Sequence, residues 1–435
     1  MNQVRTPAFR RQGASGEAPS KAVPSARRHR PDMQILLYMG LLMMLGLVVM
    51  FAIGPQRANG LNAAMGEDYY SDTYFFVRQL ISIGVALIGF AAMALIPFER
   101  IFALRRAALL AGIGACLLLA FAALIGWGIA LNTGGAVRWF DFGAISLQPA
   151  EILKFGILIH LAVFLGIQAR KGKIDDWQET LLPVGVIVAI AGLLVIVVQK
   201  DLGTGISVLS IVLAMLVAAG LSWRKFGVIM GAIGIGGVLL IATAPHRVDR
   251  VLTFLQGDQT STSNASAYHI EQAKIAIGTG GLLGVGIGNS VQATGYLPEA
   301  INDSVFAIMG ETFGFVGLVA TIALFVALLM RLLKVMDHLA DYRLKLVAAG
   351  VFGWFGVHVI LNIGAMIGIV PLTGITLPLL SFGGTSMLFV AAALGLVFQL
   401  SRYTTHGSVI KEADYEGSSS RRRVRGPRYA GRRSA

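Results

Sequence analysis

The chain has 435 residues, of which 55% are hydrophobic and only 14% are charged. Soluble proteins carry roughly 25% charged residues, so this composition excludes an ordinary soluble domain. It predicts an all-α, polytopic integral membrane protein instead. The net charge of +13 does not lead us to expect a nucleic-acid partner, because much of it lies in two polar tails, residues 1–32 and 402–435. We expect both tails to be disordered, cytoplasmic and close to anionic membrane lipids.

Ten apolar segments lie between the tails, each of them close to the 20 or so residues that one bilayer crossing requires. They lie near residues 33–54, 74–97, 106–131, 150–168, 181–199, 203–221, 226–244, 304–330, 346–369 and 384–401. The sequence therefore predicts one membrane domain over residues 33–401 with about ten transmembrane helices.

Lysine and arginine are concentrated in alternate connectors between these segments. One connector holds Arg170, Lys171 and Lys173, whereas residues 371–383 carry no charge. By the positive-inside rule, we expect both termini in the cytoplasm. Residues 245–303 then form a large external loop between the seventh and eighth helices.

The end of this external loop and the start of the next segment hold three carboxylates: Glu299, Asp303 and Glu311. Asp303 could cap the following helix, yet a cap does not require three acids. An acidic group near Arg247 and Arg250 could deprotonate a hydroxyl or hold a divalent cation such as Mg²⁺ or Mn²⁺. We expect no organic cofactor.

Arg247 and Arg250 are three residues apart, so a helix would direct both toward one ligand. Guanidinium groups suit phosphate or pyrophosphate. The glycine-rich residues 278–288, GTGGLLGVGIG, lack the features of a phosphate-binding loop, since no buried strand precedes them and no GK[ST] follows. They favour close approach of an irregular backbone to lipid or to a neighbouring helix.

A shorter external connector, residues 132–149, places Arg138 beside Trp139. It leads into Glu151 and Lys154, which share one face of a helix. Two interpretations stay open for this pair: a neutralised pair that orients the helix end, or polar groups that line a cavity at membrane depth.

Asp201, in the tight QKDLGT connector, lies at the outer membrane edge and either caps the next helix or contributes to a site. Residues 371–386, rich in Pro and Gly, predict a re-entrant segment. Such backbone is tolerated at membrane depth only where protein or a cavity satisfies it.

These motifs together closely resemble the SEDS family (shape, elongation, division and sporulation), the FtsW/RodA/SpoVE group. The resemblance extends from residue 33 to residue 401. The segments that carry it are GGAVRWFDFG with SLQPAEILKF, QKDLGT, RVDRVLTF, YHIEQAKIAIGTGGLLGVGIGNSVQ, YLPEAINDSVFAIMGE and NIGAMIGIVPLTGITLPLLSFGGTS. The GNSVQ and YLPEA wording is nearer to the division branch, FtsW, than to RodA.

The resemblance implies a peptidoglycan glycosyltransferase that polymerises lipid II into glycan strands at the outer face of the cytoplasmic membrane. It also implies a class B penicillin-binding protein and other divisome proteins as partners. The family's essential aspartate falls on Asp303, as general base or cation ligand. Its other sensitive positions fall on Arg138, Trp139, Glu151, Lys154, Asp201, Arg247, Arg250 and Lys274. The arginines, Lys274 and Trp139 would bind the substrate pyrophosphate, and Glu151, Lys154, Asp201, Glu299 and Glu311 would support the cavity.

Three alternatives remain at this point. A lipid II flippase would need a polar path through the bilayer, an elongation polymerase of the RodA type would differ only in its cellular process, and a non-catalytic divisome scaffold would not need Asp303 for activity.

Overall fold

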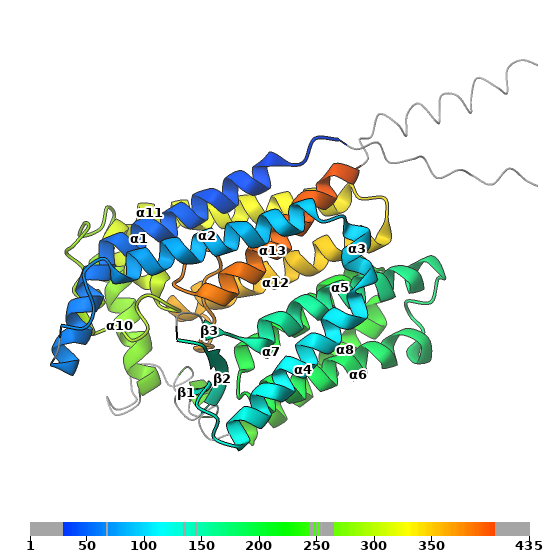
Figure 1. Cartoon of the computed structure of the whole chain (residues 1–435), viewed down its shortest axis with the longest axis horizontal. Coiled ribbons are helices and arrows are strands. Elements are labelled where there is room, and N and C mark those ends of the chain that lie inside the picture. Colours follow the sequence, from blue (N-terminus) through cyan, green and yellow to red (C-terminus); the bar gives the residue numbers. More distant parts are fainter. Residues whose placement is uncertain are drawn as a thin grey trace, which may run out of the picture.

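The computed structural model describes residues 29–66, 68–133, 136–143, 146–243, 248, 250–252, 254 and 265–404. Long helices running roughly side by side dominate this part of the chain (Figure 1). The major ones are α1 (Met33–Met65), α2 (Tyr74–Leu95), α4 (Arg105–Leu124), α5 (Pro149–Arg170), α6 (Leu182–Gly192), α7 (Leu202–Ala218), α8 (Trp223–Ala242), α11 (Val305–Asp337), α12 (Tyr342–Met366) and α13 (Gly384–Leu400). The π-helical turns η1 (Trp177–Leu181) and η2 (Leu193–Val198) extend α6 at either end.

Within the described residues, nine helical stretches are long and apolar enough to cross a membrane, and α7, with 17 residues, is a shorter apolar helix. Each of the ten predicted segments coincides with one of these stretches. The all-α, multi-pass prediction is therefore confirmed for this part of the chain.

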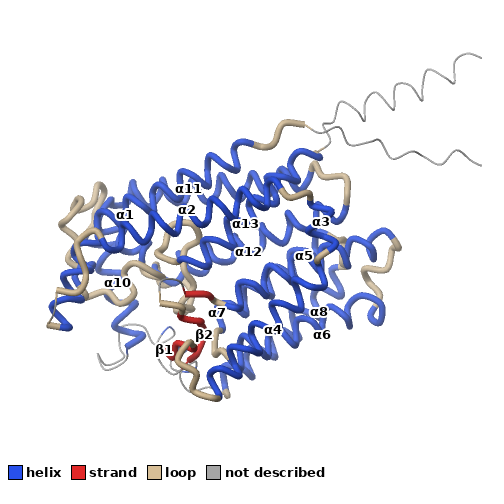
Figure 2. The backbone as a smooth tube through the Cα atoms, in the orientation of Figure 1, coloured by secondary structure: helices blue, strands red, loops and turns tan. Residues whose placement is uncertain are grey.

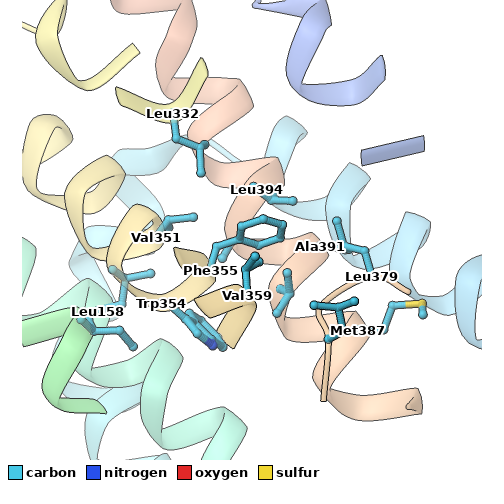
Figure 3. Packing of buried hydrophobic residues seen from close by; sticks show 14 of the residues in the cluster. Leu158, Leu332, Val351, Trp354, Phe355, Val359, Leu379, Met387, Ala391 and Leu394 are labelled. Atoms are coloured by element: carbon cyan, nitrogen blue, oxygen red, sulfur yellow. The ribbon is translucent and has the colours of Figure 1, made fainter. Parts of the chain in front are cut away.

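The centre of the bundle is α12, which is buried on several sides and packs against α5, α7, α11 and α13. In Figure 3, Trp354 of α12 points toward Leu158 of α5, and Phe355 of α12 lies next to Leu394 of α13. An apolar helix without a polar face belongs inside a bundle. Packing on several sides therefore fixes the positions of the side chains of α12, including its few polar ones.

The sequence did not indicate a small antiparallel sheet, which lies at one end of the bundle near α10 (Ala265–Thr279) (Figure 2). It consists of β1 (Ala130–Thr133), β2 (Ala136–Asp141) and β3 (Ser146–Leu147), in that order. Phe140 anchors it by packing on Leu119 and Ala122 of α4. The connector predicted as a loop is therefore a rigid support for Arg138.

The first helix is longer than its apolar segment, which ends near residue 54. It continues through Pro55 to Met65 because its last turns pack against the glycine-rich region. Gln56 Nε2 donates to the Gly288 carbonyl at 2.5 Å. A Cβ on Gly60 would lie 2.3 Å from the Thr294 carbonyl oxygen, so the two backbones nearly touch. Tertiary contact, not hydropathy, sets this boundary.

The glycine-rich residues 278–288 dock on a break in α11. Gly314, with φ +67°, interrupts the helix, and Phe315 N donates to the Gly281 carbonyl while Val285 N donates to the Glu311 carbonyl. A Cβ on Gly284 would lie 2.2 Å from the Thr312 oxygen. The structure thus bears out the interpretation that these glycines permit close approach to a helix.

Candidate functional site

Asp303 lies in the turn that begins α11. The N-cap of α11 is Ser304, not Asp303, and no side chain caps this helix. The Ser304 hydroxyl instead donates to the Pro298 carbonyl at 2.7 Å and lies 2.6 Å from His269 Nε2 of α10. The capping alternative for Asp303 is therefore wrong, and its carboxylate is left for another role.

The Asp303 carboxylate is held in an unfavourable environment for a charge. The Oδ1 atom is enclosed and has no hydrogen-bond partner among the described residues. Burial and the nearby carboxylate of Glu299 raise the pKa of Asp303 to about 7, against the opposing effects of backbone hydrogen bonds and of Arg250. A carboxyl group with this pKa exchanges a proton near neutral pH, as a general base requires.

Asn362, from α12, holds the backbone of Asp303 in place. Its Nδ2 donates to the carbonyls of Asp303 and Ile375, both at 2.7 Å. Phe382 N donates to the Ile301 carbonyl at 2.9 Å. Since residues 369–383 have no regular helix or strand, these bonds tie the predicted re-entrant segment directly to the turn that carries Asp303.

Two guanidinium groups lie on the same side of the bundle as Asp303. Arg250 donates to the Leu372 carbonyl at 3.3 Å, and its charge interacts with those of Asp303 and Arg138. Arg138, on β2, donates from Nη2 to the Lys200 carbonyl at 2.8 Å. Arg247 lies outside the described residues. The structure therefore brings Arg138, Arg250 and Asp303 into one electrostatic cluster.

Three other predicted residues lie around this cluster. Glu299 has φ +51° and accepts from Asn302 Nδ2 at 2.5 Å, which holds its carboxylate near Asp303. Lys274 extends from α10 toward Gly368, where an added Cβ would lie 3.2 Å from Lys274 Cε. Trp139 is opposite Leu131 in the sheet.

Glu151 and Lys154 form a fully buried ion pair at the start of α5. Their side chains are 3% and 0% exposed, with Oε1 and Nζ 2.7 Å apart. Lys154 Nζ also lies over the Trp354 ring, 4.6 Å from its centroid. A buried charge is costly unless it is paired, and here each member of the pair neutralises the other at the start of α5.

Asp201 is the N-cap of α7. Its Oδ1 accepts from Thr204 N at 2.9 Å, and its Oδ2 accepts from Gln148 Nε2 at 3.1 Å. The capping interpretation of Asp201 is confirmed. The bond from Gln148 adds a link between α7 and the start of α5.

Glu311 binds backbone rather than a cavity. Its carboxylate accepts from Ser290 Oγ at 2.5 Å and from Val291 N at 3.0 Å, and it also accepts from Gln292 N. It thereby fixes the short helix η4 (Gln292–Thr294) that leads to the Asp303 turn.

Within the described residues, no group of three or more His, Cys, Asp or Glu side chains is close enough to hold a metal ion. Asp303 and Glu299 supply two carboxylates. Mg²⁺ commonly takes one or two protein carboxylates and completes its shell with substrate phosphates and water. The enclosed Oδ1 of Asp303 fits such a ligand, and the divalent cation stays a prediction.

His358 and Asn362 were not predicted as site residues. They are four apart on α12 within an otherwise apolar segment, a pattern that marks polar groups facing the interior of a bundle. His358 Nε2 lies 2.9 Å from Ser207 Oγ, and its Nδ1 lies 3.3 Å from the Thr376 carbonyl. Both side chains therefore hold the irregular segment, and their spacing was the available signal.

The fold and the site define a polytopic membrane protein with a carboxylate and arginine cluster at one end of its helix bundle. Residues 33–406 match the family described as Cell cycle protein, FTSW_RODA_SPOVE. The chain belongs to this FtsW/RodA/SpoVE family.

Individual relatives are similar over most of their length. The chain is 32% identical over 385 residues to stage V sporulation protein E of Bacillus subtilis (strain 168), which covers 88% of this chain and 100% of that one. It is 34% identical over 364 residues to a probable peptidoglycan glycosyltransferase FtsW of Pseudomonas fluorescens (strain SBW25), covering 82% and 86%.

Solved structures share the fold. A chain from work on the structural coordination of polymerization and crosslinking by a peptidoglycan synthase complex has a TM-score of 0.64 and 26% identity, covering 86% of this chain and 98% of that one. The rod shape determining protein RodA of Thermus thermophilus has a TM-score of 0.58 and 24% identity, also covering 86% and 98%.

Proposed function

We propose that the protein is a peptidoglycan glycosyltransferase that polymerises lipid II at the outer face of the bacterial cytoplasmic membrane. One observation carries the site assignment: Asp303 has an enclosed, unpartnered Oδ1 and a pKa of about 7 beside Arg250. The relatives named as FtsW glycosyltransferases support the activity and the division branch. The cytoplasmic placement of both termini rests on the distribution of Lys and Arg.

In this mechanism, Asp303 takes the proton from the attacking sugar hydroxyl as the oxygen bonds to the anomeric carbon. The bond from that carbon to the lipid pyrophosphate breaks, and the pyrophosphate leaves with the electron pair. Arg250 and Arg138 stabilise the charge that develops on the leaving group. In the alternative role, as a cation ligand, Asp303 would hold a divalent cation together with Glu299, and the cation would neutralise the charge of the leaving pyrophosphate.

The buried charges of the helices favour this chemistry over transport through the bilayer. Among the described residues, the buried charged side chains are Glu151, Lys154 and Glu311. Glu151 and Lys154 lie in the first two turns of α5, and Glu311 lies in the second turn of α11. All three belong to the end of the bundle that carries Asp303, whereas a charged path for a flippase would require charged groups farther along the helices.

A crosslinking partner, a class B penicillin-binding protein, fits the same proposal. The likeness to a chain of a peptidoglycan synthase complex supports such an assembly. Crosslinking beside the polymerase would use each glycan strand as it leaves the Asp303 site.

The test gives purified protein, with and without the penicillin-binding protein, labelled lipid II and Mg²⁺ or Mn²⁺. We expect glycan ladders from the parent and from Asp72→Asn, an exposed residue of the external 66–73 connector. We expect none from folded Asp303→Asn. Normal ladders from Asp303→Asn would refute its role as the base. Transfer of lipid II across proteoliposomes without polymer would favour the flippase.

A further inference from the structure

A cavity lies between α1 and α11, at the end of the bundle away from Asp303. The cavity there has a volume of about 550 Å³. Its lining includes Gln34 and Tyr38 from α1 and Met330, Arg331, Lys334 and His338 from the end of α11. None of these residues belongs to the polymerisation site, so the cavity is separate from that site.

The two basic side chains of this cavity, Arg331 and Lys334, differ in how they are paired inside the protein. Arg331 forms an ion pair with Asp32, the N-cap of α1, and this bond fixes the guanidinium at the cavity wall. Asp337 also contributes to the lining. Within the described part of the chain, Lys334 forms no ion pair with a carboxylate. The Lys334 ammonium is therefore available to an anion from outside.

The cavity lies at the level of a membrane surface. After the break at Gly314, α11 runs from Phe315 to Asp337, and at about 1.5 Å per residue this part is about 34 Å long. The hydrocarbon core of a bilayer is about 30 Å thick. Lys334, in the last turn of α11, is then at the depth of lipid headgroups.

Exposed apolar side chains continue from the cavity along both helices. On α11 they follow one face at Met330, Val326, Ile322 and Val319, and on α1 at Leu37, Leu41, Met44 and Val48. Spacings of three and four keep each set on one side of its helix. Acyl chains can lie along these faces while a headgroup occupies the cavity.

The chain's own tails do not complement the cavity. His29 N donates to the Arg402 carbonyl and Asp32 N to Ser401 Oγ, so the ends of the membrane domain meet beside α1. Residues 1–28 hold six Arg and Lys against one Glu, and residues 405–435 hold eight against three acids. Both segments carry a net positive charge, the same sign as Lys334, which favours an external anion over either tail as the ligand.

We propose that this cavity binds the phosphodiester headgroup of an anionic membrane lipid such as phosphatidylglycerol. Lys334 and Arg331 face the phosphate, Gln34 and Tyr38 donate hydrogen bonds to the headgroup, and the acyl chains follow the exposed faces of α1 and α11. Basic pockets between transmembrane helices on the cytoplasmic side suit such headgroups. The bound lipid would lie at the point where both basic tails leave the membrane domain.

The test is native mass spectrometry of the full chain in detergent, titrated with phosphatidylglycerol or with zwitterionic phosphatidylcholine. We expect tighter binding of phosphatidylglycerol and a loss of about fivefold in Lys334→Gln, from the effect of one basic residue near an anionic surface. Lys334→Arg should retain binding. The control is Lys171→Gln, which removes an exposed lysine at the same end of the bundle that does not line the cavity and should lose less binding than Lys334→Gln.

A photoreactive phosphatidylglycerol should crosslink to residues 34–38 and 330–338. Equal losses in Lys334→Gln and Lys171→Gln, or equal affinity for the two lipids, would overturn the proposal. Displacement of the lipid by millimolar inorganic phosphate would identify a soluble anion as the ligand and would overturn it as well.

Discussion

Replacing Asp303 with asparagine should abolish polymerisation and yet stabilise the fold. Burial and Glu299 raise the pKa of Asp303 from 3.8 to about 7. Each pKa unit corresponds to about 1.4 kcal/mol, so this environment costs up to about 4 kcal/mol when the carboxylate is charged. Asparagine has nearly the same shape and carries no charge. The substitution therefore removes the free-energy cost of the buried charge, and it also removes the general base.

The sign of the pH dependence follows from proton binding. Between pH 4 and pH 7 the folded parent holds a proton on Asp303 that the unfolded chain has released, so its free energy of unfolding falls as pH rises through this window. Asp303→Asn lacks this dependence. We expect the variant to be more stable than the parent by up to about 4 kcal/mol at pH 8, with the difference narrowing toward pH 5. Glycan synthesis by the parent should rise with pH to about 7 and then level off.

The single cysteine provides the assay. Cys116 is 1% exposed in α4, so a thiol-reactive fluorogenic dye labels it only when the bundle opens on heating. Parent, Asp303→Asn and the exposed control Asp72→Asn are compared at the same pH, which cancels the effect of pH on the thiol. A lower midpoint for Asp303→Asn than for the parent at pH 8, or a difference that does not change with pH, would refute the reasoning.

Three further variants test the supports of the site. Asn362→Leu removes both donors to the Asp303 and Ile375 carbonyls. At about 1 to 1.5 kcal/mol for each bond, we expect kcat to fall by about 30-fold to 160-fold, and an unchanged kcat would show that Asn362 does not position Asp303. Glu311→Gln loses the charge-assisted bonds to residues 290–292, so the Cys116 labelling midpoint should fall by an amount equivalent to about 2 kcal/mol. Gly284→Ala places a Cβ 2.2 Å from the Thr312 oxygen at φ +83° and should lower the midpoint strongly. Gly278→Ala, with nothing within 4 Å, is its control, and equal midpoints would contradict the close approach.

The transmembrane helices were predictable because a bilayer imposes the same demand on every crossing. About 20 apolar residues must satisfy their own backbone as a helix, and composition alone reveals this. The limits of the helices were less predictable. The extension of α1 to Met65 depends on Gln56 and Gly60 meeting a segment more than 200 residues away, and no local pattern reports such a contact.

The charged residues of the site could be predicted from the sequence, but the residues that hold them in position could not. Asp303 and Arg250 are conspicuous because charges are rare in this chain. The contact between His269 and Ser304 joins two polar residues that are unremarkable in an external loop. The sheet was also missed, because its strands are too short to leave a pattern in the sequence. The strand β3 has only two residues, which pair with Phe140 and Asp141 of β2.

The irregular backbone at the outer end gives the Asp303 site its geometry. Three breaks in regular structure meet there: the turn that carries Asp303, residues 367–383, and the interruption of α11 at Gly314. Asn362 of α12 holds the first two, and backbone hydrogen bonds to the glycine-rich segment hold the third. Asp303 therefore does not depend on its own helix alone, and a change in α12 can move it without touching it. A substrate with a long polyprenyl chain has to enter from the bilayer. A fold that keeps continuous helices in the hydrocarbon and places the breaks at the polar surface allows that entry while the carboxylate stays fixed.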